Sequence, residues 1–278
     1  MRKIGFIADF YTDQINGGGE NNDSNLINFL RTKSEIYCYR CESVCTSDLE
    51  SLDVIVVGNF VMLSNEIKQY LMNEKKYIIY EHDHKYVNTR DPSVFPNFKV
   101  PEANIINRDF YESSHCTVVL SEVCKRVMLQ NMPNVNVKSI GCSLWSESKF
   151  SLLSELAKTQ KNGKICVMGS DNPTKNYLKA VAFCKSKNLD FDTIANSDHE
   201  GFLRSMSNYQ TFLFLPKVLE TFSRICAEAK MMNLKVMTNK GLIGFFSEDY
   251  STLQGQELID CLKQKNLDGL ELFRMLIC

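Results

Sequence analysis

The stretch "TFLFLPKVLETFSRICAEAKMMNLKVMTN", residues 211–239, contains a complete strand–helix–strand unit. It opens with a short apolar run and closes with a second one, "KVMTN" at 235–239. Between them, residues 222–233 carry apolar side chains at the spacing of one helical face. Two short apolar strands joined by a crossover helix are typical of a parallel sheet. The stretch therefore predicts an α/β fold.

The same alternation of apolar runs and amphipathic segments extends along the whole chain. In the first half we expect strands at 3–8, 53–58, 76–81, 116–121 and 137–141. In the second half we expect strands at 164–169, 191–195, 211–215 and 235–239. Helix-like segments lie at 64–74, 121–131, 174–188, 198–208 and 222–233. The pattern predicts two doubly wound domains, each built around a parallel sheet.

A polar segment separates the two halves. "SLWSESKFSLLSELAKTQKNG" (143–163) ends in Asn-Gly immediately before a strand, so we expect the boundary within it. The predicted domains are 1–145 and 163–278, joined by a linker at 146–162. Ligands of open α/β sheets bind beyond the carboxyl ends of the strands. We therefore expect functional side chains in the loops that follow the strands.

The composition is that of an ordinary globular protein. The chain has 278 residues, 44% apolar and 23% charged residues and a net charge of −1, without an apolar run of membrane length. Its eleven cysteines are an odd number spread along the chain, which favours a reducing compartment, and we expect a cytoplasmic protein. Cys38, Cys41 and Cys45 have metal-like spacing. No second ligand pair follows at zinc-site spacing, which favours structural cysteines.

Three consecutive glycines follow the first predicted strand. Gly17, Gly18 and Gly19 precede Glu20 and a predicted helix, so the backbone can approach a ligand closely and the helix N-terminus favours an anion. A flexible loop is the alternative interpretation. The G-x-G-x-x-G fingerprint of dinucleotide-dependent oxidoreductases is not matched, because the third glycine is missing.

The loop "YEHDHKYVNTR" (80–90) gathers charged residues and two histidines at the end of the third strand. His82 could contact sugar hydroxyls or help to position an acceptor. A metal site is one rival interpretation, since His82 and His84 face the same way if the chain is extended. A solvated charged turn is another.

The loop after the first strand of the second half contains Gly169, Pro173 and Lys175. Gly169 allows a tight exit from the strand, and Pro173 can begin a helix. Lys175 then lies near a helix N-terminus, where it could neutralise a diphosphate together with backbone amides. A solvated surface lysine is the alternative.

Two glutamates flank the start of the helix at 222–233. Glu220 precedes the helix, and Glu228 lies two turns inside it. Because each carboxylate accepts two hydrogen bonds, Glu220 can bind sugar hydroxyls and Glu228 a vicinal diol such as a ribose. The competing interpretation is that Glu228 only pairs with Arg224 at i,i+4.

These motifs resemble those of retaining nucleotide-sugar glycosyltransferases of the GT-B fold, in the large family-4-like group. "ETFSRICAEA" (220–229) resembles their paired-glutamate motif, and "MGSDNPTKN" (168–176) their diphosphate loop, with Ser170 where an arginine is common. "GGGEN" (17–21) resembles their glycine loop, and the His82 region their active-site histidine loop. The short chain also resembles small glycosyltransferases of phages and large viruses.

The resemblance implies two Rossmann-like domains facing a central cleft, with the donor, expected to be a UDP-sugar, held mainly by the second. Lys175 would contact the diphosphate, Glu228 the ribose, and Glu220 the transferred sugar. The implied donor-binding residues are Gly18, Gly19, Gly169, Lys175, Thr221, Phe222, Ser223 and Glu228. The implied catalytic residues are His82 and Glu220. The implied acceptor-side residues are Glu20, Asp83, His84, Lys85 and Arg90. No metal or other cofactor is expected, since GT-B enzymes typically need none.

The acceptor stays open at this point. Some phage and viral enzymes of this kind glycosylate hydroxymethylated bases in DNA, and residues 68–138 contain ten Lys or Arg against eight Asp or Glu. Saccharide and lipid-linked glycan acceptors are alternatives. A non-catalytic nucleotide-sugar-binding protein is an alternative of another class. We expect no transmembrane segment, and the oligomeric state is open.

Overall fold

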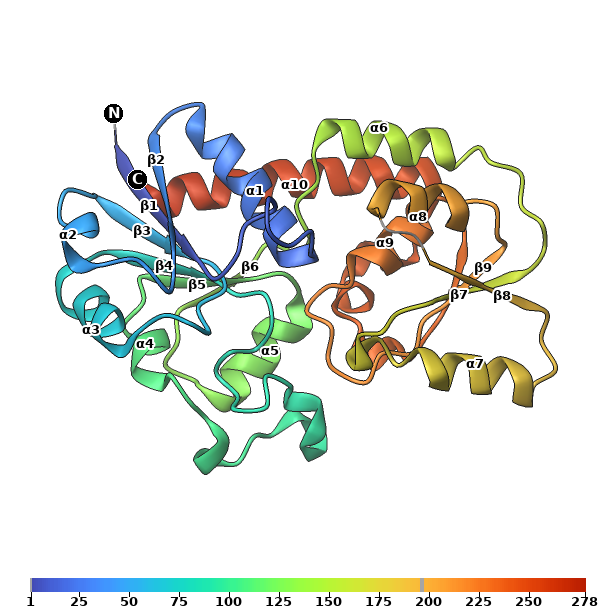
Figure 1. Ribbon diagram of the computed structural model, residues 1–278, viewed down its shortest axis with the longest axis horizontal. Coiled ribbons are helices and arrows are strands. Elements are labelled where there is room, and N and C mark those ends of the chain that lie inside the picture. Colours follow the sequence, from blue (N-terminus) through green and yellow to red (C-terminus); the bar gives the residue numbers. More distant parts are fainter. Residues whose placement is uncertain (1, 196–197) are drawn as a thin grey trace. The chain divides into compact units, whose positions relative to one another are not determined.

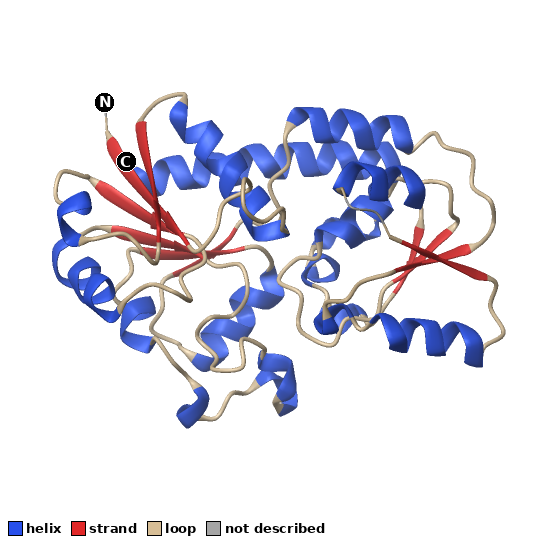
Figure 2. Cartoon of the chain, in the orientation of Figure 1, coloured by secondary structure: helices blue, strands red, loops and turns tan. Residues whose placement is uncertain are grey.

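The computed structural model describes residues 2–195 and 198–278, which divide into two compact units (Figures 1 and 2). Unit 1 consists of Met1–Trp145 and Lys265–Cys278, and unit 2 of Ser146–Gln264. Each unit has its own sheet, and the strands paired in each sheet are parallel. Helices alternate with strands along the chain. The predicted α/β fold with two Rossmann-like units is therefore confirmed.

Unit 1 contains a six-stranded sheet in the order β2-β1-β3-β4-β5-β6 within the described residues. The strands are β1 Lys3–Ala8, β2 Glu35–Arg40, β3 Val54–Val57, β4 Tyr77–Tyr80, β5 Cys116–Val119 and β6 Val137–Ser139. The α-helices are α1 Gly18–Arg31, α2 Thr46–Leu49, α3 Asn65–Glu74, α4 Arg108–Glu112 and α5 Glu122–Asn131. Short 3₁₀ helices lie at Pro92–Val94, Pro96–Phe98 and Glu102–Asn104.

The strand order of unit 1 reverses between β1 and β3. The chain passes from β1 to β2 on one side and then returns to β3 on the other. At such a switch point the loops after the two strands diverge, which leaves room for a ligand at the carboxyl edge. Every residue of β3, β4 and β5 is buried, as continuous apolar strands covered on both faces should be.

Strand β2 was not predicted. It lies at the edge of the sheet and pairs with β1 alone, and none of its residues is fully buried. The sequence Glu-Ile-Tyr-Cys-Tyr-Arg carries charged residues at both ends, so it lacks the continuous apolar run of the inner strands. The spacing of Cys38 and Cys41 therefore comes from an edge strand and the turn that follows it.

Unit 2 contains a four-stranded sheet in the order β10-β9-β7-β8 within the described residues. The strands are β7 Ile165–Met168, β8 Phe191–Ile194, β9 Thr211–Leu213 and β10 Lys235–Met237. The α-helices are α6 Glu147–Leu156, α7 Tyr177–Ser186, α8 His199–Met206 and α9 Arg224–Met231, and α10 Gly255–Ile277 begins in this unit. Short 3₁₀ helices lie at Pro173–Lys175, Lys240–Leu242, Gly244–Ser247 and Asp249–Thr252.

The predicted domain limits need two corrections. The expected linker at 146–162 contains α6, which belongs to unit 2 because it buries Phe150 and Leu153. The final residues, expected in the second domain, belong to unit 1. There Phe273 of α10 is fully buried and packs edge-on against Tyr80 of β4, with ring centroids 4.7 Å apart. The last helix thus completes the core of unit 1.

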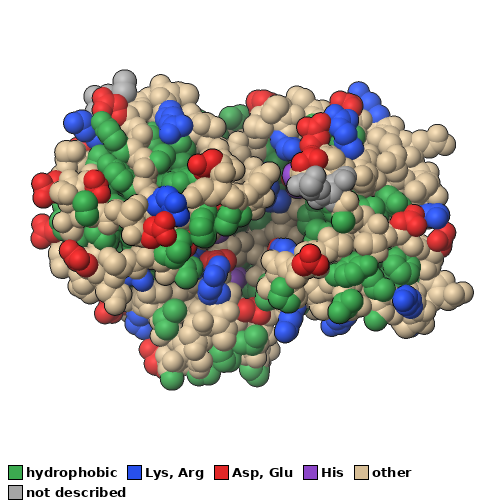
Figure 3. Space-filling view, in the orientation of Figure 1, with side chains coloured by type: hydrophobic (Ala, Val, Ile, Leu, Met, Phe, Trp, Pro, Cys, Tyr) green, Lys and Arg blue, Asp and Glu red, His purple; other side chains and the backbone are tan. Residues whose placement is uncertain are grey.

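The surface is mixed in charge. In the view of Figure 3, acidic and basic side chains alternate over both units, in keeping with the net charge of −1. Among the described residues, no helix is long and apolar enough to cross a membrane.

All eleven cysteines lie within the described ranges and are free thiols. Cys41 is buried, whereas Cys38 and Cys45 are exposed, and no group of three or more metal-ligating side chains occurs among the described residues. Burial raises the pKa of the Cys166 and Cys226 thiols to about 12. A thiol with such a pKa is almost entirely protonated near neutral pH, and only the thiolate is a good nucleophile.

We predict that alkylation distinguishes the two kinds of cysteine. Iodoacetamide at about pH 8 should modify the exposed Cys45 and Cys278 in the native protein and leave Cys166 and Cys226 intact, because burial limits both thiolate formation and access. Peptide mass spectrometry before and after unfolding in guanidinium measures this pattern. Rapid native modification of Cys166 or Cys226 would contradict the packing described above.

Candidate functional site

The loops after β7 and β9 lie side by side at one edge of the unit 2 sheet. The 3₁₀ helix Pro173–Lys175 begins after β7, with Asn172 accepting a hydrogen bond from the amide of Thr174. Lys217 N donates to Thr174 O at 2.9 Å, and Asn176 Nδ2 donates to Leu215 O at 3.0 Å. These two bonds tie the loops together. They hold Lys175 next to the segment that leads into α9.

Lys175 and Glu220 form an ion pair. Lys175 Nζ lies 2.8 Å from Glu220 Oε1, and their side chains are 31% and 14% exposed. The backbone of Glu220 is fixed, since its amide donates to Leu242 O and its carbonyl accepts from Gly244 N, each at 2.9 Å. The carboxylate is therefore presented from a rigid segment.

Glu228 is completely buried in α9 and its carboxylate is paired with a histidine. His199 Nε2 lies 3.2 Å from Oε1 and 3.0 Å from Oε2 of Glu228. Arg224 Nη2 lies at the longer distance of 3.9 Å. The interpretation in which Glu228 only pairs with Arg224 is therefore wrong. His199 is the first residue of α8, and the sequence analysis did not single it out.

The thiol of Cys226 in α9 is influenced by three of the predicted donor residues. Burial is the main cause of the raised pKa of Cys226, and the carboxylates of Glu220 and Glu228 raise it further, whereas Lys175 lowers it. Glu228 lies in the same helix as Cys226, and Glu220, paired with Lys175 at 2.8 Å, lies in the segment just before that helix. The structure thus places the Lys175–Glu220 pair next to the segment that leads into α9, and the donor-binding roles of these residues and of Glu228 stay predictions.

The N-terminus of α9 is suited to an anion. Ser223 precedes the helix in a left-handed conformation, with φ of 67°, and its own side chain makes no capping hydrogen bond. The first turn contains no acidic residue and begins with Arg224. The dipole of the helix favours negative charge at this end. Lys175 adds a cation to the same region.

Three further donor-side predictions differ in how their residues are placed. Phe222 is buried and packs edge-on against Phe245, with ring centroids 5.7 Å apart, so only its backbone can face a ligand. Thr221 is partly exposed between Glu220 and Phe222. Gly169 follows β7, and a Cβ there would lie 3.0 Å from Thr193 Cγ2, which shows that its small size serves packing against β8.

In unit 1, His82 forms a buried pair with Asp23 of α1. His82 Nε2 lies 2.7 Å from Asp23 Oδ1, and the two side chains are 4% and 1% exposed. Gly19 makes room for this pair, since a Cβ there would lie 3.3 Å from His82 Cγ. Gly58 does the same for Asp23, at 2.7 Å from Oδ2. The sequence analysis missed Asp23, which lies 59 residues from His82 and has no local signal.

Gly18 and Glu20 lie in the first turn of α1. Gly18 is the first helical residue, and Gly17 before it has no side chain to cap the helix. Glu20 is largely buried, and its carboxylate folds back toward Gly17. The backbone of the glycine loop therefore lies close to the ring of His82, and the carboxylate of Glu20 is not exposed at the surface.

Lys85 lies at the centre of a buried network. Its ammonium lies 2.6 Å from Glu81 Oε1, 3.0 Å from Asp83 Oδ1 and 3.2 Å from Asn59 Oδ1. Tyr111 donates its hydroxyl proton to the other oxygen of Glu81. Burial alone would raise the pKa of Glu81, but Lys85 and Tyr111 hold it below its usual value. This network fixes the loop that carries His82.

The structure corrects two acceptor-side assignments. Lys85 is buried in the network, and His84 is buried with its ring near Tyr86 and Cys124 Sγ, at 3.5 Å and 4.0 Å. His84 also has φ of 61°, so the chain is not extended and the two histidines of the proposed metal site turn to different partners. Asp83 and Arg90 form an ion pair nearer the surface, with side chains 25% and 51% exposed.

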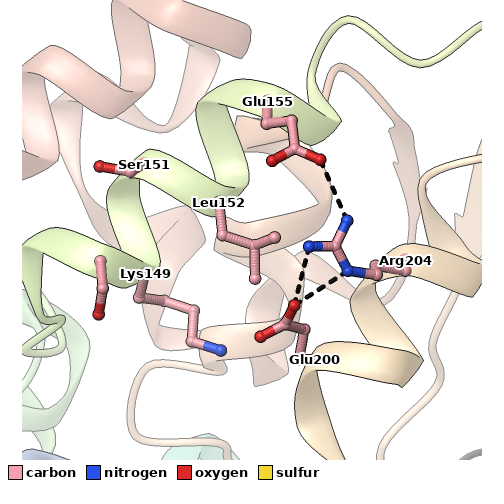
Figure 4. Close-up of a pocket in the computed structure, with 7 residues that line it drawn as sticks. Lys149, Ser151, Leu152, Glu155, Glu200 and Arg204 are labelled. Carbon is pink, nitrogen blue, oxygen red and sulfur yellow. Dashed lines mark hydrogen bonds and ion pairs between the residues drawn. The ribbon is translucent and has the colours of Figure 1, made fainter.

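A separate groove of about 550 Å³ lies between α6 and α8 (Figure 4). It is lined by Ser148, Lys149, Ser151, Leu152, Glu155, Glu200 and Arg204. Arg204 bridges the two sides, at 2.8 Å from Glu200 and 3.1 Å from Glu155. Because its charges already neutralise each other and it contains none of the predicted residues, this groove is not the candidate site.

We predict that Lys85→Met lowers the free energy of unfolding by about 3–5 kcal/mol, because it leaves the Glu81 carboxylate buried without its cation. The double variant Glu81→Gln/Lys85→Met should lose less, and the exposed Lys138→Met serves as control. Urea denaturation measures all three. Equal losses in the Lys85 and Lys138 variants would contradict the buried network.

The same pair should give the wild type an acid-sensitive component of stability. The pKa of folded Glu81 lies below its usual value of 4.5, so the contribution is complete above about pH 4.5 and is lost as the pH falls toward the folded pKa. The double variant should lack this component.

No family model matches the sequence, and no curated protein matches it. Solved structures share the fold. Sucrose-phosphate synthase from Thermosynechococcus elongatus superposes with a TM-score of 0.65 at 10% identity, covering 99% of each chain. An alpha-glucosyltransferase solved with UDP and a 13-mer DNA containing an HMU base gives 0.51 at 10% identity, covering 96% of this chain and 94% of the other.

A UDP-N-acetylglucosamine 2-epimerase from Rickettsia bellii gives a TM-score of 0.55 at 11% identity, covering 100% of this chain and 96% of the other. At such identities the likeness establishes the fold and not the reaction. The chain has the two-unit α/β fold found in GT-B glycosyltransferases.

Proposed function

We propose that this chain is a glycosyltransferase that uses a UDP-sugar as donor and transfers the sugar to a hydroxyl acceptor with retention of configuration. The observation that carries the proposal is the ion pair of Lys175 and Glu220 next to the segment that leads into α9, the helix that contains Glu228. Fold neighbours that are glycosyltransferases, one of them solved with UDP, support it.

Each of these residues matches one part of the donor. Lys175 and the first amides of α9 would bind the diphosphate, where negative charge grows as the nucleotide leaves. Glu220 would accept hydrogen bonds from the transferred sugar, and Glu228 from the ribose diol. Ser170 stands in the diphosphate loop, and Arg224 at the first position of α9 is a further cation at this helix N-terminus.

The proposed transfer needs no protein nucleophile. The bond between the anomeric carbon and the phosphate oxygen breaks, and the acceptor oxygen bonds to the same face of the sugar. The acceptor's proton passes to the leaving phosphate. The protein contributes positioning and charge stabilisation.

Unit 1 would supply the acceptor side of the reaction. We assign His82 to the transfer step, with its ring held by Asp23, and Asp83 and Arg90 to acceptor contacts because they stay near the surface. A hydroxymethylated base in DNA is the first acceptor to test, supported by the DNA-bound alpha-glucosyltransferase neighbour. The mixed surface charge in Figure 3 favours a saccharide or lipid-linked glycan as second candidate, since no broad basic field covers that face.

We predict that Glu220→Ala and Glu228→Ala each lower the turnover of UDP-glucose by at least about tenfold, about 1.4 kcal/mol, because contacts to the donor are lost. Lys175→Ala should weaken UDP binding by a similar factor. Hydrolysis without acceptor and calorimetry measure these effects, with Glu155→Ala as control. Wild-type binding without any turnover, even with acceptors supplied, would favour a non-catalytic binding protein.

The acceptor is tested by incubating the protein with radiolabelled UDP-glucose and duplex DNA with or without hydroxymethylated bases. We predict label only in the modified duplex, because plain bases offer no hydroxymethyl oxygen. DNA affinity should fall with added salt as counterions are released. His82→Ala should lower transfer more than UDP-glucose binding. Label in a saccharide and in neither duplex would overturn the DNA assignment.

A further inference from the structure

Both carboxylates of the proposed donor site form ion pairs within the protein. Glu220 is paired with Lys175 at 2.8 Å, and Glu228 with His199 at 3.0 Å. Both carboxylates that would accept hydrogen bonds from the donor's hydroxyls are therefore already bound to basic side chains. The Lys175–Glu220 pair is the more accessible of the two, because Glu228 is completely buried.

Binding of a diphosphate must change the Lys175–Glu220 pair. The ammonium group of Lys175 would turn toward the phosphate oxygens, which compete with Glu220 for the same positive charge. Glu220 would then keep its position, because its backbone is bridged to Leu242 and Gly244. Its carboxylate, only 14% exposed, would lose its cation in a place where water replaces it poorly.

The cost of this exchange depends on what else the ligand carries. A nucleotide-sugar brings hydroxyl groups that can donate to the released carboxylate. A sugar-free nucleoside diphosphate lacks these sugar hydroxyls, and its ribose hydroxyls are assigned to Glu228, so the carboxylate of Glu220 stays under-satisfied. An internal contact that penalises one ligand and not the other produces specificity without any new attraction.

We propose that the Lys175–Glu220 ion pair is a specificity element that favours the nucleotide-sugar over the sugar-free nucleoside diphosphate. It lets the nucleoside diphosphate formed in the reaction leave, since Glu220 regains Lys175 as the product departs. The inference rests on the proposed donor site and adds a role for Glu220 beyond contact with the sugar.

Glu220→Gln tests the proposal because it keeps the shape of the side chain and removes the charge. Lys175 is then free of its internal competitor, so UDP should bind more tightly than in the wild type. UDP-glucose should bind no more tightly, because an amide makes weaker hydrogen bonds with hydroxyls than a carboxylate does. The ratio of the dissociation constants of UDP and UDP-glucose should fall by about tenfold.

The measurement is calorimetric titration of the intact protein with UDP and with UDP-glucose. Glu155→Gln is the matched control, because Glu155 also pairs with a basic side chain of unit 2, Arg204, at 3.1 Å. Its ratio should equal that of the wild type. Lys175→Met should weaken both ligands, and adding Glu220→Gln to it should change the ratio little, since the pair no longer exists.

Three outcomes would count against the proposal. If Glu220→Gln changes both ligands by the same factor, or weakens UDP more than UDP-glucose, the pair does not discriminate. Glu220→Ala must shift the ratio in the same direction, which covers a Gln variant that fails to fold. If the wild type binds neither ligand, the proposed function itself fails. If the wild type binds both ligands and Glu220→Gln leaves the ratio of their dissociation constants unchanged, only this inference fails.

Discussion

The parallel pairing of every strand in the two sheets is the constraint from which the sites follow. Parallel strands direct all their carboxyl ends to one edge, so the loops after β7, β8 and β9 must meet there. Lys175 and Glu220 lie in the connections after β7 and β9, and His199 begins α8, the helix that follows β8. The residues are 24 and 21 positions apart in sequence, and only this topology brings such distant loops to one edge. In unit 1 the same rule places His82 after β4 at the edge where α1 begins.

Much of this arrangement is visible in the sequence, because buried parallel strands are continuous apolar runs. All four strands of unit 2 and five of the six described in unit 1 were predicted. The exception, β2, is an edge strand without such a run. Helix α6 was mistaken for a linker, since its apolar residues are separated by serines and charged residues. The later part of α10, from Lys265 on, was assigned to the wrong unit, because the position of Phe273 depends on a contact with Tyr80 that no local pattern encodes.

The residues of the candidate site also divide into those that the sequence singles out and those that it does not. The sequence singles out Lys175, Glu220 and Glu228 because their motifs have recognisable order and spacing, and their roles in donor binding stay predictions. Their partners were harder to find: His199 lies 29 residues before Glu228, and Asp23 lies 59 residues before His82. His199 could have been noticed as a histidine just beyond a predicted strand. His84 and Lys85 belong to a loop whose charged residues and histidines are typical of a ligand-binding site. Only the burial of their side chains in the structure reveals that they stabilise the loop instead.

Helix α10 has a consequence for how the chain is made. Residues 265–278 belong to unit 1, where Leu270, Phe273 and Ile277 are buried. A ribosome completes the sheet of unit 1 and all of unit 2 before it reaches these residues. The first unit to be synthesised is therefore the last to have its full core, and apolar surface around Tyr80 stays uncovered throughout translation of unit 2. Vectorial folding from the N-terminus, the usual order for two-domain chains, cannot go to completion here.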